Sequence, residues 1–325
     1  MKKALITTIP FGQEDKTPIK ILEENAIDYL INPMERKFSR DELIDNLTGI
    51  SFLVAGTDKI DKEILESASE LEMISRVGIG LDSVDLLAAR DRGISVSYTP
   101  EGPSKAVAEF TMNAILSTLR NSALTSQSLK KGIWKKKMGR SVSESVIGVF
   151  GAGRIGSELI HILACFKPRK ILVYDPYVDE AKFEKNEVEF VSKNELLENS
   201  DLVTLHLPMS DSTKDFIAEK EIKAMKPNSI IINTSRGGIV NEDDLFSALK
   251  IGHLSSAAID VFEEEPYSGN LLDLDNCITT PHMAPMSKAS RISMEIDAVK
   301  EVVRFANGES LINQVPEFEY QSRVK

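Results

Sequence analysis

Short apolar runs alternate with longer amphipathic segments along almost the whole chain. The apolar runs, which predict buried strands, lie at residues 4–8, 51–54, 73–77, 95–97, 146–150, 170–174, 201–205, 230–232, 255–260 and 278–280. The segments with helical periodicity include residues 19–25, 61–68, 84–90, 104–120, 219–225, 242–250 and 288–305. Strands that alternate with helices predict parallel sheets covered by helices, so we expect an α/β fold.

A break in this alternation predicts two domains, as a length of 325 residues also favours. Residues 98–103 are rich in proline and glycine and are interpreted as a linker. The last helical segment is long enough to return to the first domain. We therefore expect one domain from residues 1–97 plus 287–325 and a second from residues 98–286. Residues 121–143 are polar and irregular, and are interpreted as a projecting arm of the kind that often forms dimers.

The segment 145–175 combines a glycine pattern with a strand and a helix. Gly151, Gly153 and Gly156 form G-x-G-x-x-G directly after an apolar run and open a helical segment, the context in which this pattern indicates a dinucleotide site. Free N–H groups at the start of a helix favour a phosphate anion. Asp175 ends the next strand, where a carboxylate can accept hydrogen bonds from the adenosine ribose and would repel a 2′-phosphate. The segment predicts NAD rather than NADP.

Composition excludes several other classes of function. A formal net charge of −11 argues against a nucleic-acid surface. The two cysteines have neither metal-ligand spacing nor a disulfide pattern. The N-terminal apolar run stops at Pro10, too early for a signal peptide, and no stretch approaches the roughly eighteen apolar residues of a membrane span. We expect a cytoplasmic protein with no metal.

Three ionisable side chains, Arg236, Glu265 and His282, follow predicted strands of the second domain. The carboxyl ends of parallel strands meet at one edge of a sheet, where ligands bind. Arginine can bind a carboxylate through two N–H groups, and histidine can exchange a proton near neutral pH. This set suits the chemistry of a 2-oxo or 2-hydroxy acid at a nicotinamide. Composition alone would favour a simpler interpretation, with Arg236 a surface arginine and Glu265 one of three solvated glutamates.

The remaining three histidines and one further loop indicate a functional site less specifically. His161 lies inside a helical segment and His253 in a turn, so both are interpreted as structural or exposed. His206 ends a strand and is interpreted as lining a site. The glycine-rich loop 76–82 follows a strand of the first domain and is a second candidate ligand site. An ordinary turn between a strand and a helix would look the same.

The sequence resembles the D-isomer-specific 2-hydroxyacid dehydrogenases, a family that includes phosphoglycerate, glyoxylate/hydroxypyruvate and D-lactate dehydrogenases. The resemblance covers nearly the whole chain and lies in the motifs VGIGLDSVDLLAARDRGI, AVAEFTM, GVFGAGRIG, VYDPY, HLPMSDSTKDFI, MKPNSIIINTSRGGIVNEDDL, AIDVFEEEP and TTPHMAPMS. It implies that Arg236 binds the substrate and that Glu265 pairs with the catalytic His282. The further substrate-binding residues that it implies are Val77, Gly78 and Arg76. The cofactor-binding residues that it implies are Gly151, Gly153, Arg154, Ile155, Asp175, His206, Thr234, Asp260 and Ala284.

The resemblance also implies a fold and an activity. The fold is a pair of doubly wound parallel-sheet domains, a flavodoxin-like substrate domain and a Rossmann-like NAD-binding domain, in a homodimer built on the NAD-binding domain. The activity is NAD-dependent transfer of a hydride between the nicotinamide and C2 of a small D-2-hydroxy acid or 2-oxo acid. An alternative is a corepressor-like regulator that senses NADH without significant turnover, because such regulators resemble this family.

The sequence departs from the family pattern at two places. The family usually has a glycine two or three positions after the catalytic histidine, whereas this chain has Met283-Ala284-Pro285-Met286, so the pocket wall or a dimer contact would differ there. Residues 54–57 lack the arginines that phosphoglycerate enzymes place nearby. The sequence leaves open whether the substrate is phosphorylated, because Arg76 or Lys59 could hold the phosphate instead.

Overall fold

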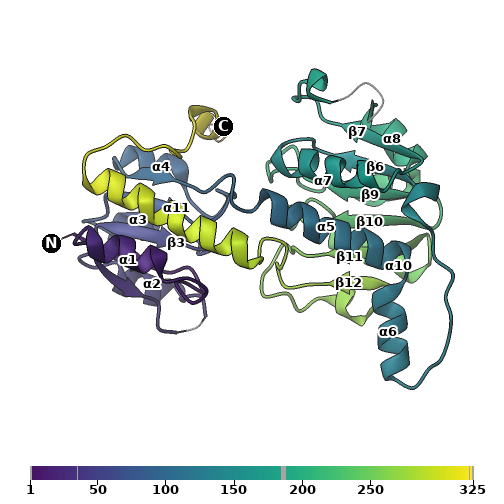
Figure 1. Cartoon of the computed structure of the whole chain (residues 1–325), viewed down its shortest axis with the longest axis horizontal. Coiled ribbons are helices and arrows are strands. Elements are labelled where there is room, and N and C mark those ends of the chain that lie inside the picture. The colour runs from purple at the N-terminus through teal and green to yellow at the C-terminus, as the bar shows by residue number, and fades with distance from the viewer. Residues whose placement is uncertain (1, 35, 184–187, 322, 324–325) are drawn as a thin grey trace. The chain divides into compact units, whose positions relative to one another are not determined.

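The computed structural model describes residues 2–34, 36–183, 188–321 and 323, and the chain divides into two compact units (Figure 1). Unit 1 is Met1–Pro103 with Ser287–Lys325, and unit 2 is Ser104–Met286. The division follows Pro103, whereas the sequence places it after residue 97. The linker begins within unit 1 because the Tyr98 N–H donates to the Asn313 carbonyl and the Thr99 N–H donates to the Gly78 carbonyl, both at 3.1 Å.

Unit 1 is a parallel sheet with helices on both faces. Its elements are β1 (Lys3–Ile6), α1 (Thr17–Glu24), β2 (Asp28–Ile31), α2 (Arg40–Asn46), β3 (Phe52–Ala55), α3 (Lys62–Ser67), β4 (Met73–Arg76), α4 (Leu86–Asp91), β5 (Ser95–Ser97), α11 (Lys288–Ala306) and α12 (Glu317–Gln321). The strands of the described residues pair in the order β2-β1-β3-β4-β5. This is the flavodoxin-like order, so the predicted fold of the first domain is confirmed.

Alternate residues of β3 show how this sheet is covered on both faces. Phe52 and Val54 pack in the cluster that includes Leu22 of α1 and Ala298 of α11, whereas Leu53 packs in the cluster formed with α2, α3 and α4.

The sequence did not predict β2 or α2. Among the described residues the edge strand β2 pairs with β1 alone, and it is partly exposed, so it lacks the apolar run of a central strand. The Ser39 capping box, with Glu42 at the third helical position, is the signal that would have found α2.

Unit 2 is a larger parallel sheet. Its elements are α5 (Ser104–Leu119), α6 (Ser122–Lys130), a 3₁₀ turn at Val142–Glu144, β6 (Val146–Phe150), α7 (Arg154–Cys165), β7 (Lys170–Tyr174), a 3₁₀ turn at Glu180–Lys182, β8 (Glu189–Phe190), α8 (Lys193–Asn199), β9 (Leu202–Leu205), α9 (Glu219–Ala224), β10 (Ser229–Asn233), α10 (Glu242–Lys250), β11 (Leu254–Ile259), a 3₁₀ turn at Asn270–Asp273 and β12 (Cys277–Thr279). The order is β12-β11-β10-β9-β6-β7-β8 in the described residues. Counted from β6, this is the Rossmann order with one added strand, so the predicted fold is confirmed.

The central strand β6 supplies both halves of the core of unit 2. Ile147 and Val149 pack with α5 and α7 on one face of the sheet. Val146 and Phe150 pack in the second cluster with α8, α9 and α10 on the other face. The near-continuous apolar run of this strand is therefore explained by burial on both faces. Figure 1 shows α5 and α7 lying side by side over the sheet, as their contacts require.

The segment 121–143 contains a helix that the sequence did not predict. It was expected to be irregular, but α6 occupies Ser122–Lys130. This helix buries none of its residues, so it lacks the apolar periodicity by which a helix is recognised in a sequence. Its end is marked by Gly132, which has a φ of +78°. No helix in the described ranges is long and apolar enough to span a membrane.

Candidate active site

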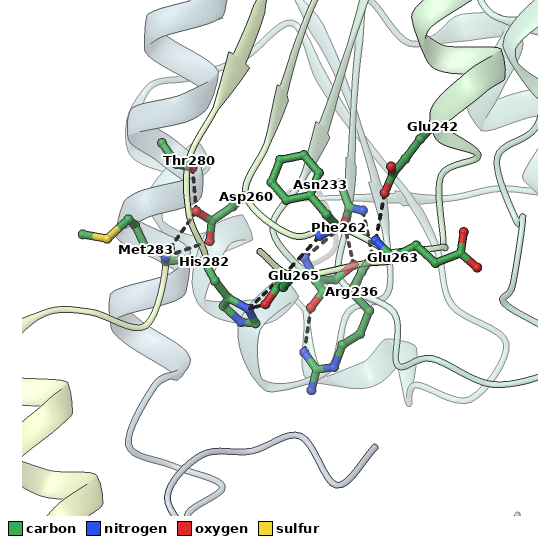
Figure 2. A network of polar contacts seen from close by, with 12 residues as sticks. Asn233, Arg236, Glu242, Asp260, Phe262, Glu263, Glu265, Thr280, His282 and Met283 are labelled. Atoms are coloured by element: carbon green, nitrogen blue, oxygen red, sulfur yellow. Dashed lines mark hydrogen bonds and ion pairs between the residues drawn. The ribbon is translucent and has the colours of Figure 1, made fainter. Parts of the chain in front are cut away.

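Arg236, Glu265 and His282 meet at the carboxyl edge of the sheet of unit 2. Arg236 follows β10, Glu265 lies in the loop after β11, and His282 follows β12. These three strands are direct neighbours in the sheet, which is why residues far apart in the sequence come together. Figure 2 shows the side chains at this edge with the hydrogen bonds that connect their loops.

His282 and Glu265 form a direct pair. The Nδ1 atom of His282 lies 3.1 Å from both Oε1 and Oε2 of Glu265, and both side chains are partly exposed. Because Nδ1 is engaged by the carboxylate, Nε2 is the nitrogen that can exchange a proton with a bound molecule. His282 has a φ of 54°, a left-handed conformation that is uncommon for residues other than glycine and occurs often at active sites.

Asp260 holds the backbone around His282 in this conformation. Its Oδ1 accepts hydrogen bonds from the Thr280 hydroxyl at 2.5 Å and the Met283 N–H at 2.8 Å, and its Oδ2 accepts from the Ala284 N–H at 2.8 Å. The His282 N–H donates to the Asp260 carbonyl at 2.8 Å. Asp260 is 1% exposed, and this burial raises its pKa, whereas the hydrogen bonds act in the opposite direction. The sequence predicted only a cofactor role for Asp260.

The loop that carries Glu265 is held by residues that the sequence analysis did not single out. A Cβ added to Gly237 would lie 1.9 Å from the carbonyl carbon and oxygen of Phe262, so only glycine allows this approach of two backbones. The Glu242 carboxylate accepts from the Glu263 N–H at 2.8 Å. The Phe262 N–H donates to Oε1 of Glu265 at 3.3 Å. The adjacent glycines of the S-R-G-G motif were the available signal for this contact.

Arg236 lies at the end of a loop that Asn233 organises. The amide of Asn233 donates to the Arg236 carbonyl at 2.8 Å, and its oxygen accepts from the Ser235 N–H at 3.1 Å and hydroxyl at 2.8 Å. The Arg236 guanidinium is partly exposed and donates to the Ser235 carbonyl at 2.6 Å. It therefore carries a positive charge into the same edge as the His282–Glu265 pair (Figure 2).

The glycine loop after β6 fits a bound dinucleotide. Gly151 has a φ of +88°, and a Cβ on Gly156 would lie 2.0 Å from the Gly151 carbonyl oxygen, whereas no atom lies within 4 Å of a Cβ on Gly153. The first two glycines thus provide the tight turn and the open space for a pyrophosphate, and the third allows close helix packing. Arg154 and Ile155 follow as the first residues of α7, where backbone N–H groups favour an anion.

Asp175 lies beside this loop and is bound to it. Its Oδ2 accepts from the Ala152 N–H at 2.8 Å, and its Oδ1 accepts from the N–H groups of Tyr177 at 2.9 Å and Val178 at 3.2 Å. The carboxylate therefore has a fixed position next to the glycine loop. This placement fits the predicted contact with the adenosine ribose.

The other predicted cofactor residues lie on the same side of unit 2. Burial lowers the pKa of His206 to about 3, so its ring is neutral near neutral pH and suits lining rather than acid catalysis. Its Nε2 lies 3.0 Å from the Thr204 hydroxyl. Thr234 is buried, and its hydroxyl lies 2.8 Å from that of Thr111. Ala284 is buried and held by Asp260.

The candidate carboxylate-binding loop of unit 1 forms hydrogen bonds within its own unit. The Val77 N–H donates to the Ala55 carbonyl at 2.9 Å, and the Gly78 N–H donates to the Thr99 hydroxyl at 2.7 Å. Both groups that were predicted to bind a substrate carboxylate are thus engaged within unit 1, because β4 continues its pairing through Val77 and the linker covers Gly78. Arg76 is buried, and its Nη1 donates to the Val77 carbonyl.

Comparison with known proteins agrees with this geometry. The sequence pattern of the family described as D-isomer specific 2-hydroxyacid dehydrogenase, NAD binding domain, matches residues 112–284. The chain is 38% identical over 324 residues to a D-3-phosphoglycerate dehydrogenase of Methanocaldococcus jannaschii, covering 96% of this chain and 60% of that protein. It is 33% identical over 295 residues to a hydroxypyruvate reductase of Thermotoga maritima, covering 87% and 95% of the two chains.

A solved structure has the same fold over nearly its whole length. The D-lactate dehydrogenase of Aquifex aeolicus, determined with NAD and lactic acid, superposes with a TM-score of 0.84 at 26% identity, covering 97% of this chain and 98% of that one. The chain spans about 60% of the length of the archaeal D-3-phosphoglycerate dehydrogenases that it matches.

Proposed function

Because the chain belongs to the D-isomer specific 2-hydroxyacid dehydrogenase family and contains its NAD-binding domain, we propose that it is an NAD-dependent oxidoreductase. The reaction is the transfer of a hydride between the nicotinamide and C2 of a small D-2-hydroxy acid or the corresponding 2-oxo acid. The observation that carries this proposal is the 3.1 Å contact between His282 Nδ1 and the Glu265 carboxylate, beside Arg236 at the carboxyl edge of the Rossmann sheet.

Each of the three side chains has one task in this reaction. Arg236 binds the substrate carboxylate, for which a guanidinium offers two parallel N–H groups. In the reductive direction His282 donates a proton from Nε2 to the C2 oxygen, and in the oxidative direction the neutral ring accepts that proton. Glu265 orients the ring through Nδ1 and stabilises the imidazolium. When bound, NADH supplies the hydride. Asp260 positions His282 through the backbone at 280–284.

The loop after β4 in unit 1 stays a proposed carboxylate-binding loop. The loop after β4 offers the N–H groups of Ile79 and Gly80, which have no hydrogen-bond partner within the described part of the chain. The N–H of Gly78 becomes available if the Thr99 hydroxyl turns away, since this single bond engages it. Binding through backbone N–H groups is the role that the family resemblance implies for this loop.

We further propose that the protein is a homodimer that forms through the arm 121–143 of unit 2. Large apolar side chains of the arm are exposed, namely Leu129 at 53%, Ile133 at 52%, Trp134 at 82% and Met138 at 94%. Apolar side chains gathered on one exposed segment are typical of an interface between proteins. Size-exclusion chromatography with light scattering tests this, and a monomeric mass across the accessible concentration range would contradict it. The cytoplasmic location stays a prediction.

The activity is tested by following NADH oxidation with glyoxylate, hydroxypyruvate, pyruvate, 2-oxobutyrate and phosphohydroxypyruvate. We expect turnover with at least one of these acids. His282→Ala should lose most of the rate and retain NADH binding, whereas Glu264→Gln, in the same loop as Glu265, should retain the rate. Tight NADH binding without turnover of any acid would refute the proposal. That result would favour the alternative of an NADH-sensing regulator, which has no support in the relatives described above.

A further inference from the structure

The loop that carries Glu265 is joined to the start of α10 by one carboxylate. Glu242 is the first residue of this helix, and its Oε1 accepts a hydrogen bond from the Glu263 N–H at 2.8 Å (Figure 2). One residue earlier in the loop, the Phe262 N–H donates to Oε1 of Glu265 at 3.3 Å. Both carboxylate oxygens of Glu265 lie 3.1 Å from Nδ1 of His282. A short series of contacts therefore connects Glu242 with the ring of His282.

The peptide group between Phe262 and Glu263 packs against the loop after β10. A Cβ on Gly237 would lie 1.9 Å from the carbonyl carbon and oxygen of Phe262 and 2.4 Å from the nitrogen of Glu263. Phe262 is buried, and its ring stacks on that of Tyr267 with the centroids 4.0 Å apart. These contacts restrict where the peptide group lies. The hydrogen bond to Glu242 also fixes the direction in which its N–H points.

The Glu242 carboxylate belongs to a well-anchored helix terminus. The side-chain oxygen of Asn241 accepts from the Asp244 N–H at 3.1 Å and caps α10. The Asp244 carboxylate accepts from the Glu219 N–H at 2.8 Å, so the first turn of α10 is joined to α9. A hydrogen bond to an ionised carboxylate is roughly twice as strong as one between neutral groups. The loop 261–266 is therefore held by a strong acceptor on a rigid element.

The surroundings of Glu242 are unfavourable for its negative charge. Burial raises its pKa, the hydrogen bond from the Glu263 N–H lowers it, and the charges of Glu263, Asp243 and Glu264 raise it. Lys214 lies 3.3 Å from the Glu263 carboxylate, but both of these side chains are largely exposed, so water screens the pair. A carboxylate in such surroundings, near a reactive pair, is typical of a functional site.

We propose that Glu242 is a positioning residue for the proton transfer at His282. Its bond to the Glu263 N–H holds the loop in the conformation that keeps the Glu265 carboxylate on Nδ1 of His282. Nε2 then remains the nitrogen that exchanges a proton with the substrate. Because Glu242 follows the loop that begins at Arg236, the same bond joins the loops of Arg236 and Glu265. This inference rests on the proposed function, and Glu242 acts in it through Glu265.

The test measures the pH dependence of NADH oxidation with the best 2-oxo acid in Glu242→Gln and Glu242→Ala. Glutamine retains an acceptor oxygen for the Glu263 N–H, whereas alanine has none. In Glu242→Ala kcat should fall by about tenfold. This is less than the roughly 100-fold loss for a group misplaced by about 1 Å, because the packing of Gly237 still restricts the loop.

The pH profile of Glu242→Ala should change as well. A Glu265 carboxylate that is less well held stabilises the imidazolium of His282 less. The limb on which the reductive rate falls with rising pH should therefore move to lower pH. Glu242→Gln should keep a kcat and a pH profile close to those of the native protein.

Asp243→Ala is the matched control, because it removes an exposed carboxylate from the same turn of α10. An acidic residue at a helix start stabilises the helix through its charge alone, and this variant measures that effect. It should keep the native kcat and pH profile. Urea unfolding of all three variants measures their stability. A Glu242→Ala protein that loses only stability would show a structural role and overturn the inference.

The inference would also be overturned by an equal loss of kcat in Asp243→Ala or in Glu242→Gln. Absence of turnover with every acid in the native protein would instead refute the proposed function. In that case NMR follows the ring signals of His282 against pH, identified among the four histidines by their loss in His282→Ala. Their titration midpoint should move to lower pH in Glu242→Ala, and an unchanged midpoint overturns the inference.

Discussion

Replacing Asp260 with asparagine should weaken unit 2 and slow the reaction together. The carboxylate accepts from the Thr280 hydroxyl at 2.5 Å and from the N–H groups of Met283 and Ala284 at 2.8 Å. Asparagine retains one acceptor oxygen, and its NH₂ group takes the place of the other. At least one backbone N–H then faces a second donor at a site that water does not reach.

The expected loss of stability can be worked out from these contacts. A hydrogen bond to a charged group contributes about 1.5–3 kcal/mol, and a buried donor without an acceptor costs about 1–3 kcal/mol. Removing the buried charge offsets part of this, since burial raises the pKa of Asp260. We expect the free energy of unfolding to fall by about 2 kcal/mol. Because the backbone of His282 is then less well held, kcat should fall on the order of 100-fold, as for a catalytic group misplaced by about 1 Å.

Urea unfolding followed by circular dichroism measures the first quantity, and NADH oxidation with the best substrate measures the second. Thr280→Val is the matched control, because it removes one donor and leaves both backbone bonds to Asp260. It should cost about 1.5 kcal/mol, the lower end of the range for a hydrogen bond to a charged group. Unchanged stability and kcat in Asp260→Asn would refute the reasoning. A loss confined to NADH affinity would show that Asp260 acts on the cofactor and not through His282.

Three further predictions concern the remaining parts of unit 2. Gly156→Ala should destabilise the protein, because its Cβ would lie 2.0 Å from a backbone oxygen. The Cβ of Gly153→Ala would meet no atom within 4 Å, so this variant should weaken NADH binding alone. Equal stability of the two variants in urea would contradict this expectation. His206 has a pKa of about 3 in the folded protein against 6.5 for the free side chain. As the pH falls, the unfolded chain therefore binds this proton first. The free energy of unfolding should decrease between pH 6.5 and pH 3, by at most about 5 kcal/mol. His206→Asn should flatten this part of the stability profile and the exposed His161→Gln should not. Arg236→Lys should reduce kcat/KM by a factor that corresponds to about 3 kcal/mol of transition-state free energy, since lysine lacks the two parallel donors. NADH affinity should be retained. An unchanged kcat/KM would mean that another cation binds the substrate carboxylate.

The sequence by itself determined the features that depend on local pattern. Apolar runs such as 146–150 predicted strands, because a strand that is buried on both faces has no solvent-exposed positions for polar residues. Gly151, Gly153 and Gly156 predicted the dinucleotide loop because each lacks a side chain where the backbone needs space. The motifs around Arg236, Glu265 and His282 indicated the family, because the residues that define each motif lie within a few positions of one another in the sequence.

Contacts between distant segments were decided only by the tertiary structure. The backbone approach of Gly237 to Phe262, the hydrogen bonds of Asp260 to residues 280–284 and the pairing of Asp58 with Thr7 join segments that follow different strands. Such contacts depend on the order of strands in the sheet, and this order is set by the packing of helices on both faces of the whole unit. The exposed helix α6 escaped prediction for a related reason. None of its residues is buried by the described part of the chain, so its sequence has no apolar periodicity by which the helix could be recognised.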